Sequence, residues 1–516
     1  MVSKSSEDRQ TGDDPMSTPI TASMLYDLVQ CPRRVALDLF GDRGQRDPEN
    51  PFVELLWEKG HAFEKETIEA LRIPFTDLQD YSGAERQRLT LEAMRRGDPL
   101  IYRGRIAADD LLGDPDLLRR DERGYVAGDI KSGAGEEGAT EEADGKRKKH
   151  YAVQLALYTD VLERLGFSGG RVPFVWDVHR TEVIYDLDAP QGVRSPTTLW
   201  VTYLSCLEEA RQIANRSDVP LPALAGICKL CHWRTACTKL LVETDDLTLI
   251  PELGRSKRDA LAAHIPTVAG MAKADLSRFI QGKKTVIPGI GPETLAKFSS
   301  RARLQTTPGA KPYLKEPVEI PPVEVELFFD IETDPMRDIC YLHGFVERRD
   351  GDPTREKYRA FFAETPTPEA EARAFAEAWA YIRSFGPCAV YYYSPYERTN
   401  WRSLQKRYPD IATEEEIEAL FSAETTVDLY TDVVRPKTEW PTRDYSIKTL
   451  ASFLGFKWRD SNPSGAASIE WYHRWVESKD PEIRQRILDY NEDDCVATRV
   501  LLDGIRRLKT GAPLAR

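Results

Sequence analysis

Three cysteines within ten residues place the strongest constraint on how this chain can fold. Cys228 and Cys231 are separated by two residues, Cys237 follows after five more, and the whole chain contains only eight cysteines. Four thiolates are a usual ligand set for a structural zinc ion or an iron–sulfur cluster. Cys31 is the candidate for the fourth ligand, because its setting is polar and Pro32 follows it. The pattern therefore predicts a metal centre that closes a loop of about two hundred residues.

The overall composition indicates a soluble protein of several domains. The chain has 516 residues, too many for one hydrophobic core, and roughly 150 residues per domain predicts about three units. Its formal net charge of −13 weakly disfavours a nucleic-acid partner, although basic patches can coexist with catalytic acids. No stretch reaches the ~18 apolar residues of a membrane span, and the N-terminus lacks an apolar signal segment. We therefore expect a cytoplasmic protein without a membrane partner, whose clustered cysteines bind metal rather than form disulfides.

Changes in composition and periodicity divide the chain into five segments. Helical spacing of apolar residues follows the polar N-terminus, and a Pro- and Lys-rich stretch precedes the last segment. Strands and helices that alternate along the chain indicate α/β domains. The predicted segments are a disordered tail (1–17), an α/β domain with the four cysteines (18–245), a short helical segment (246–305), a linker (306–322) and a second α/β domain (323–510).

Two aspartates and a lysine stand together on a predicted hairpin in the first α/β domain. Residues 116–120 and 125–131 form the two expected strands around a polar turn. Alternation places Asp129 and Lys131 on one face, and strand pairing brings Asp116 beside them. Two carboxylates can hold Mg²⁺ or Mn²⁺, and an ammonium can stabilise charge that develops during phosphodiester hydrolysis. The alternative for so short a pattern is a solvated hairpin edge.

The wider context of this hairpin resembles the PD-(D/E)XK nucleases, in particular the RecB and AddB branch. The resemblance lies in Gly113-Asp114-Pro115-Asp116, in Gly128-Asp129-Ile130-Lys131, and in the downstream Gln154 and Tyr158. In that branch a helix upstream of the aspartates carries a histidine, and His61 matches it. The resemblance implies a restriction-endonuclease-like fold whose metal is bound by Asp116, Asp129, the Ile130 carbonyl and His61. It also implies that Lys131 assists the attacking water and that Gln154 and Tyr158 brace the site or the DNA.

The four cysteines fit the same branch. AddB-type nucleases carry a 4Fe–4S cluster held by one cysteine before the nuclease fold and three after it, in the spacing seen here. The resemblance therefore implies a 4Fe–4S cluster on Cys31, Cys228, Cys231 and Cys237. Spacing alone fits a structural zinc ion as well, with His232 as a substitute ligand, and this alternative stays open. The remaining cysteines are interpreted as small buried hydrophobic residues: Cys206, Cys340, Cys388 and Cys495.

A glycine-containing turn in the middle segment is a third candidate site. Pro288 to Leu295 resembles the helix-hairpin-helix DNA-binding motif, in which Gly289 and Gly291 would let backbone N–H groups contact a phosphate. An ordinary turn between two helices, with glycine supplying a positive φ, is an alternative of equal weight. Nearby basic residues favour a nucleic-acid partner: Lys283, Lys284, Lys297, Arg301, Arg303, Lys311 and Lys315.

The second α/β domain carries an acid pair at the end of a predicted strand. Asp330 and Glu332 lie on one face of the apolar stretch that begins at Val325, where they can reach a pair of metal ions. Far downstream, Tyr490 and Asp494 are four residues apart and share one helix face. The adjacent Asp493 would point about 100° away and is secondary. Solvated surface acids are the alternative, but this combination of pairs rarely arises by chance.

These residues resemble the DEDDy exonucleases of the RNase H-like superfamily, including the YprB-like branch. The resemblance implies that the strand-end pair, Asp494 and a further middle acid hold two Mg²⁺ or Mn²⁺ ions. It also implies that Tyr490 aligns the water for 3′-to-5′ hydrolysis. The middle acid of the family is usually an aspartate; here Glu397 stands in the corresponding place, with Asp428 in reserve. The segment Ser446 to Leu450 matches the family too, without a clear role.

Together these patterns predict a metal-dependent DNA nuclease with two hydrolytic sites, which acts in DNA repair or processing on single strands or free ends. The order of domains is similar to that of RecB-family nucleases that also carry an RNase H-like unit. In the alternative hypothesis, the N-terminal half is a non-catalytic iron–sulfur clamp on DNA, joined to a single active exonuclease whose substrate could be RNA. The chain has no P-loop nucleotide motif, so a helicase would be a separate partner.

Overall fold

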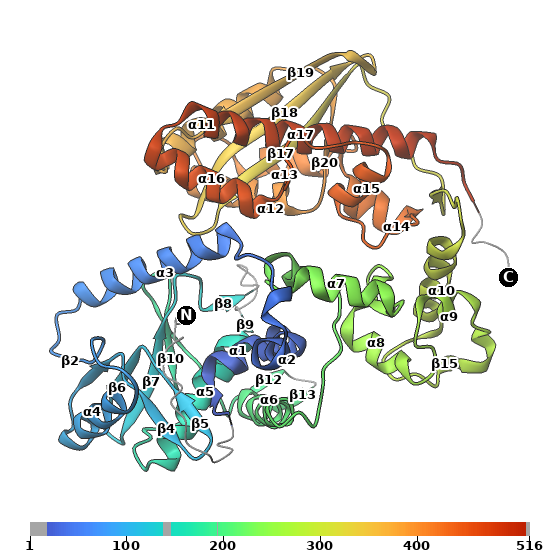
Figure 1. The fold of residues 1–516 in the computed structure, drawn as a ribbon. Helices are drawn as coiled ribbons and strands as arrows, with labels where there is room; N and C mark the ends of the chain where they lie inside the picture. Colours follow the sequence, from blue (N-terminus) through green and yellow to red (C-terminus); the bar gives the residue numbers. More distant parts are fainter. Residues whose placement is uncertain (1–17, 138–145, 193–194, 512–516) are drawn as a thin grey trace. The chain divides into compact units, whose positions relative to one another are not determined.

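The computed structural model describes residues 18–137, 146–192 and 195–511, which divide into two units (Figure 1). Unit 1 comprises the chain up to Pro222 together with Ile227–Ala236, and unit 2 comprises Ala223–Gly226 and the chain from Cys237 onward. The predicted disordered tail, 1–17, lies outside the described residues. None of the described helices is both long enough and apolar enough to cross a bilayer.

A six-stranded mixed sheet forms the centre of unit 1. Its strands are, from edge to edge, β11 (Glu182–Ile184), β10 (Phe174–Trp176), β7 (Tyr125–Ile130), β6 (Leu117–Arg120), β3 (Leu100–Tyr102) and β2 (Thr76–Asp77). β6 and β7 pair antiparallel around a turn in which the Asp121 N–H donates to the Gly124 carbonyl at 2.8 Å. The predicted hairpin is therefore confirmed. β10 runs parallel to β7, which is buried along its whole length.

Helices cover both faces of this sheet. Alternate side chains of β7 point to opposite faces and therefore join two different apolar cores. Tyr125 and Ala127 join one apolar core with α1 (Ala22–Gln30), α5 (Lys149–Arg164) and α6 (Leu199–Ala214). Val126 and Ile130 join a second core with α3 (Pro51–Glu69). α2 (Pro32–Phe40) follows α1 at the predicted break, where proline occupies the first helical position.

The shorter elements of unit 1 surround this framework. They are β1 (Ile20–Thr21), η1 (Arg43–Gln45), α4 (Gly83–Arg96), β4 (Ile106–Ala108), β5 (Leu111–Gly113), β8 (Glu136–Glu137), β9 (Lys146–Arg147), β12 (Pro190–Gly192) and β13 (Ser195–Thr198). After α6, η2 (Gly226–Leu230) and α7 (Arg234–Glu243) carry the clustered cysteines. The division between the units falls within α7, after Ala236.

A five-stranded sheet forms the centre of unit 2, in the order β19-β18-β17-β20-β21. The strands are β17 (Val325–Asp334), β18 (Ile339–Arg349), β19 (Asp352–Phe362), β20 (Cys388–Tyr392) and β21 (Thr426–Asp428). β17, β18 and β19 are antiparallel neighbours, whereas β20 and β21 continue the sheet in parallel from the other side of β17. The predicted apolar strand is therefore confirmed and is the central strand of the sheet.

The alternation of β17 decides which helices lie on each side of this sheet. Leu327, Phe329 and Ile331 pack in a core with α11 (Pro368–Arg383), α12 (Tyr396–Arg407) and α13 (Glu414–Ser422). Phe328 packs on the opposite side with α15 (Ile447–Phe453) and α17 (Pro481–Arg507), the long red helix of Figure 1. Asp330 and Glu332 have the same parity as Phe328, so they face α17. The other elements of this part are η5 (Leu429–Val434), α14 (Arg435–Lys437), β22 (Thr438–Glu439) and α16 (Gly465–Ser478).

The helical segment before this sheet belongs to the same unit and contains η3 (Leu247–Leu249), α8 (Gly254–Ala262), α9 (Val268–Lys273), η4 (Leu276–Phe279) and α10 (Pro292–Thr306). A small hairpin of β14 (Ile280–Gln281) and β15 (Lys284–Thr285) stands between η4 and the glycine turn. The helix-hairpin-helix resemblance implies a turn that joins two helices directly. In the structure, the β14–β15 hairpin precedes the glycine turn instead. Gly289 has φ +72°, a left-handed conformation that favours glycine.

A buried ion-pair cluster fastens this helical segment to the sheet part of unit 2. Arg301 of α10 has a side chain only 1% exposed, and its guanidinium lies 3.0 Å from Glu439 Oε2 and 2.8 Å from Glu252 Oε2. The Tyr445 hydroxyl donates to the same Glu439 oxygen at 2.6 Å. The predicted linker takes part as well, because β16 (Tyr313–Leu314) within it pairs with β22. The segments that the sequence separates thus share one buried polar junction.

Replacing Arg301 with leucine should loosen this junction, because it leaves the buried Glu439 carboxylate without its principal cation. We expect a loss of about 3–5 kcal/mol in the free energy of unfolding of unit 2, measured by chemical denaturation. The control is Arg278→Ala, whose side chain is 79% exposed and pairs with the exposed Asp275. That variant should stay within about 0.5 kcal/mol of wild type. Equal stabilities of the two variants would contradict the proposed importance of the junction.

Candidate functional site

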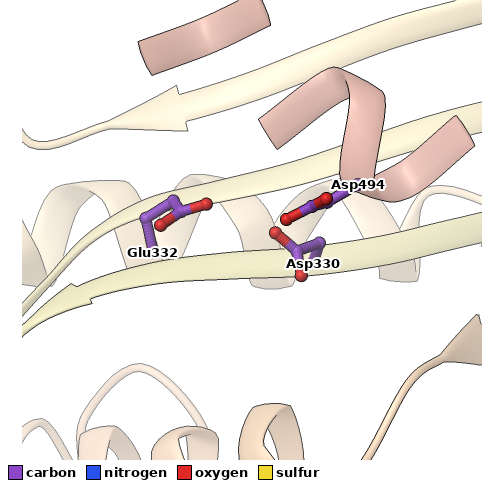
Figure 2. Close-up of side chains that lie close together, drawn as sticks. All are labelled: Asp330, Glu332 and Asp494. Atoms are coloured by element: carbon purple, nitrogen blue, oxygen red, sulfur yellow. The ribbon is translucent and has the colours of Figure 1, made fainter. Parts of the chain in front are cut away.

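Three acids of unit 2 converge at the middle of its sheet. Asp330 and Glu332 project from β17, and Asp494 projects from α17 toward them (Figure 2). One carboxylate oxygen of each residue lies within 4.8 Å of the other two, which makes this a group that could hold a metal ion. The structure therefore brings together the acid pair and the distant aspartate that the sequence predicts as one site.

Uncharged and cationic side chains hold these acids in place. The Asn491 side-chain amide donates to Asp330 Oδ2 at 2.7 Å, and the Trp458 indole donates to Asp494 Oδ1 at 2.7 Å. Lys448 Nζ lies 3.2 Å from both Asp494 carboxylate oxygens and 2.9 Å from the Tyr490 hydroxyl. Each contact comes from α15, α17 or the loop between α15 and α16. The segment of unclear role in the sequence thus supplies the cation of the site.

Repulsion between the buried carboxylates changes their acidity. Burial, followed by the charge of Asp494, raises the pKa of Glu332 to about 8. Burial also raises the pKa of Asp330 well above its usual range, and the neighbouring carboxylates raise it further. Like charges held this close favour protonation unless a cation compensates them. The geometry therefore suits divalent metal, which would neutralise several carboxylates at once.

Glycine at position 344 allows α17 to reach the sheet. Gly344 on β18 is the direct cross-strand partner of Asp330 on β17. A Cβ atom at this position would lie 1.6 Å from Oδ1 of Asn491, the residue that donates to Asp330. No side chain fits there without displacing Asn491, because that asparagine is itself fully buried and accepts from the Tyr358 hydroxyl at 2.8 Å.

Glu397 and Asp428, the two candidates for the middle acid, have different surroundings. Asp428 Oδ1 accepts hydrogen bonds from the backbone N–H groups of Ser394, Tyr430 and Thr431, and so caps η5. Glu397 is 3% exposed, and its Oε2 has no hydrogen-bond partner among the described residues. Burial and then the charges of Asp428 and Asp494 raise the pKa of Glu397 well above its usual value. Glu397 thus has a carboxylate oxygen that could bind a metal ion.

The adjacent Asp493 points away from this cluster, as the sequence predicts. Its carboxylate accepts from the Arg459 backbone N–H at 2.7 Å and from the Arg459 guanidinium at 2.9 Å. A cavity of about 290 Å³ has Arg459 and Tyr490 among its lining residues. Asp493 and Asp494 therefore contact different residues, although they are adjacent in α17.

In unit 1, the structure brings Asp116, Asp129 and Lys131 together at one end of the β6–β7 hairpin. Asp116 Oδ2 accepts from the Ile130 N–H at 2.9 Å, and Lys131 Nζ lies 2.8 Å from Asp129 Oδ2. Both aspartates are at most 3% exposed. Burial, then the charges of Asp129 and Glu64, raises the pKa of Asp116 to about 7. Burial opposes the charged form of Lys131, but the two aspartates outweigh it and raise the pKa of Lys131.

Gln154 and Tyr158 of α5 form a chain of hydrogen bonds behind this lysine. Lys131 Nζ donates to Gln154 Oε1 at 3.3 Å, and Gln154 Nε2 donates to the Tyr158 hydroxyl at 3.0 Å. The Tyr158 hydroxyl in turn donates to the Asp114 carbonyl at 3.4 Å. Tyr158 is only 2% exposed, so its place in the structure is that of a brace rather than of a surface contact.

The helix upstream of the aspartates presents a different residue from the predicted histidine. His61 is exposed on α3, whereas Glu64, one turn later, is 2% exposed. Glu64 Oε1 accepts from the Tyr102 hydroxyl at 3.0 Å, and Arg103 Nη2 donates to Glu64 Oε2 at 2.5 Å. After burial and the charge of Asp129, the charge of Glu64 is the next cause that raises the pKa of Asp116, so an acid of α3 acts on the aspartates.

Three of the four clustered cysteines belong to unit 1, and Cys237 belongs to unit 2. Cys31 lies between α1 and α2. Burial raises the pKa of the Cys231 thiol, and the neighbouring Cys31 and Cys228 raise it further. His232, the alternative ligand, is 8% exposed and its Nε2 lies 2.8 Å from Asp38 Oδ1. Its other ring nitrogen, Nδ1, lies 3.4 Å from Arg46 Nη2, so both ring nitrogens have polar neighbours in unit 1.

Two family models match the chain. Residues 23–238 match the PD-(D/E)XK nuclease superfamily, and residues 327–505 match the RNase_H_2 model of the RNase_H superfamily. A comparison with curated proteins finds no match. The first region contains Asp116, Asp129 and Lys131, and the second contains Asp330 and Asp494. Two regions of the chain are therefore similar to nuclease-type domains, each contains a cluster of acids, and both superfamilies generally use divalent metal.

Several residues of these sites were not predicted from the sequence. Asn491 and Trp458 bind the acids of unit 2, and Glu64 and Arg103 stand beside those of unit 1. The neighbours of Asn491 in the sequence, Tyr490 and Asp494, were an available signal for it. Trp458 and Arg103 lie in loops without a periodic pattern, so the sequence carries no signal for them.

Substituting Gly344 with alanine should displace Asn491 and disturb the support of Asp330. Because the new Cβ would overlap Asn491 Oδ1, we expect a loss of about 1–3 kcal/mol in the free energy of unfolding, measured by chemical denaturation. The matched control is Gly386→Ala, since nothing lies within 4 Å of a Cβ at that position. If Gly344→Ala is as stable as wild type, Asn491 can be displaced without cost, and the prediction is wrong.

Proposed function

We propose that this protein is a metal-dependent DNA nuclease with two hydrolytic sites, a RecB-like site in unit 1 and a 3′-to-5′ exonuclease site in unit 2. The observation that carries the proposal is the convergence of Asp330, Glu332 and Asp494 beside Tyr490, within a region that matches the RNase_H superfamily. Its role would lie in DNA repair or processing, on single strands or free ends. We propose further that the site of unit 1 is of the AddB-like type and that of unit 2 of the YprB-like type.

In the exonuclease site, each side chain has a defined task. Asp330, Glu332 and Asp494 would hold Mg²⁺ or Mn²⁺. Glu397, which is not part of that close group of oxygens, would join them as the middle acid, and its Oε2, without a hydrogen-bond partner among the described residues, favours it over Asp428. The metal would polarise the phosphate and supply hydroxide. Tyr490 would orient the attacking water, with its hydroxyl held by Lys448 Nζ at 2.9 Å. Lys448, 31% exposed, could also offset charge that develops on the phosphate.

In the RecB-like site, Asp116, Asp129 and the Ile130 carbonyl would hold the metal. Lys131 would keep its proton, because two carboxylates stabilise the ammonium, and it would stabilise negative charge at the phosphate. The chain of hydrogen bonds through Gln154 and Tyr158 would hold the Lys131 ammonium in position. The glycine turn before α10 would add phosphate contacts through backbone N–H groups, near the exposed Lys283 and Lys284.

Two single substitutions test whether the sites are separate. We expect Asp129→Ala and Asp330→Ala each to remove one activity on end-labelled single-stranded DNA, by on the order of a hundredfold or more, because each removes a metal-binding carboxylate. The double variant should be inactive. The controls are Asp80→Ala and Asp410→Ala, exposed aspartates in the same two units.

The same assays separate this function from its rivals. If Asp129→Ala changes nothing while Asp330→Ala removes all cleavage, unit 1 is a non-catalytic clamp. If a matched RNA strand is degraded faster than DNA, the substrate assignment is wrong. Unchanged digestion by the double variant would overturn the nuclease proposal as a whole.

The four-cysteine pattern leads to a separate expectation, a 4Fe–4S cluster on Cys31, Cys228, Cys231 and Cys237. Anaerobically purified protein should contain about four iron and four sulfide per chain, and Cys31→Ser should lose them. Because the cluster would close the loop around the RecB-like site, this variant should also lose the activity that depends on Asp129 but keep that of Asp330. Cys388→Ser is the control. One zinc ion per chain without iron would replace the cluster by a structural zinc site.

A further inference from the structure

A lysine at the start of α5 lies beside the RecB-like site, and the proposed hydrolysis does not use it. Lys148 is the N-cap residue of this helix. Its Nζ atom lies 5.2 Å from the centroid of the Tyr151 ring, and Nζ of Lys131 lies 5.5 Å from the same centroid. An ammonium group this close to an aromatic ring is attracted by the electrons of the ring face. Tyr151 therefore holds two ammonium groups against one ring, and one of them belongs to the proposed hydrolytic site.

The Tyr151 ring is part of a cluster of three aromatic side chains. Its centroid lies 4.6 Å from that of His150, and the His150 centroid lies 4.8 Å from that of Tyr26 on α1. All three side chains are partly exposed. A Cβ atom at Gly133, two residues after Lys131, would lie 3.6 Å from the Tyr151 hydroxyl oxygen. The ring contacts thus fix the Tyr151 side chain near the end of β7, beside the RecB-like site.

The two lysines differ in how their charges are compensated. Lys131 Nζ lies 2.8 Å from Asp129 Oδ2. Lys148 forms no ion pair among the described residues, and burial lowers its pKa although Glu137 and Asp177 partly offset this effect. The Asp177 carboxylate already accepts hydrogen bonds from three backbone N–H groups. A half-buried ammonium group without a counter-ion is unfavourable, and an anionic ligand would relieve this cost.

His150 shows that the charges of the two lysines are not cancelled at this cluster. Burial, followed by the charges of Lys148 and Lys131, lowers the pKa of His150 to about 4. The imidazole is therefore uncharged at neutral pH, and it adds no positive charge of its own. Both lysines would attract an anion here, and each backbone phosphate of a nucleic acid carries one negative charge. The cluster is thus suited to a phosphate group.

We propose that Lys148 binds the backbone phosphate next to the scissile one in a nucleic-acid strand at the RecB-like site, and that Tyr151 positions this lysine. The inference rests on the proposed function of unit 1, in which Lys131 stabilises charge on the scissile phosphate. Since both ammonium groups lie against one ring, the phosphate at Lys148 is a close neighbour along the strand of the one at Lys131. A phosphate contact adds affinity without sequence preference. Lys148 therefore fixes the position of the strand and not the base that is cleaved.

The reactivity of the lysine itself tests this contact without turnover. We would acetylate the full chain with acetic anhydride, with and without a single-stranded oligonucleotide and with Ca²⁺ in place of Mg²⁺, and quantify each modified lysine by mass spectrometry. With DNA at about ten times its Kd, acetylation of Lys148 should slow about tenfold, because the bound phosphate occupies its ammonium group. Lys149 is the matched control, since it is the next residue, is exposed and should stay reactive.

Modified substrates test which phosphate the lysine binds. In an Asp330→Asn background, which removes the activity of unit 2, Lys148→Gln should raise the KM of the remaining cleavage by roughly tenfold and change kcat little, because a charged binding contact is lost. A neutral methylphosphonate at the linkage next to the scissile one should cost as much in the background protein and nothing further in Lys148→Gln. Lys149→Gln is the control and should respond to the methylphosphonate as the background does.

The role of Tyr151 needs a variant that keeps the ring. Tyr151→Leu should raise KM and reduce the protection of Lys148 by DNA, because it removes the face that holds the ammonium group. Tyr151→Phe keeps that face and should restore both values. Tyr81→Leu is the control, since Tyr81 is 44% exposed elsewhere in unit 1. Thermal unfolding identifies any variant that fails to fold, and the acetylation of the wild-type chain does not depend on variants.

Two results would overturn the proposal. They are equal protection of Lys148 and Lys149 by DNA, and a methylphosphonate cost that persists undiminished in folded Lys148→Gln. If DNA protects Lys148 but the Asp330→Asn protein cleaves no nucleic acid, the proposed function of unit 1 is wrong and the phosphate contact stands.

Discussion

The repulsion between carboxylates buried at one place is the interaction on which both units depend. Each unit brings acids from separate elements to its sheet, where burial alone would make their charged forms costly. Each unit also places lysine or arginine side chains beside these acids, Lys131 and Arg103 in unit 1 and Lys448 in unit 2. The folds therefore have to position cations as accurately as acids, and this requirement explains why α3, α5 and α15 are fixed by polar contacts as well as by apolar packing.

The sequence predicted those parts of the sites that follow from local periodicity. Alternation along a strand places Asp330 with Glu332 and Asp129 with Lys131, and helical spacing places Tyr490 with Asp494, so these pairs needed no tertiary knowledge. It did not predict which turn of α3 faces the aspartates. His61 and Glu64 are three residues apart on that helix, and only the packing of α3 against the sheet decides between them. Loop residues such as Trp458 could be found only from the structure.

The extent of each domain was harder to predict than its type. A Pro- and Lys-rich stretch normally indicates a linker, yet β16 within it pairs with β22. The composition of a segment indicates how flexible it is when it is free. It does not indicate whether a strand more than one hundred residues away in the sequence pairs with it. The same limit applies to Arg301, which the sequence presents as part of a basic surface and the structure buries at 1% exposure between Glu439 and Glu252.

The junction at Arg301 has a consequence for how such proteins evolve. The part of unit 2 that follows residue 323, excised alone, would lose Arg301 and Lys315, which both contact Glu439. The Glu439 carboxylate would keep the Tyr445 hydroxyl as a donor but would have lost both cations. Gene fusion or fission at this boundary would therefore be selected against unless Glu439 changed at the same time. The helical segment and the sheet part of unit 2 should be inherited as one module.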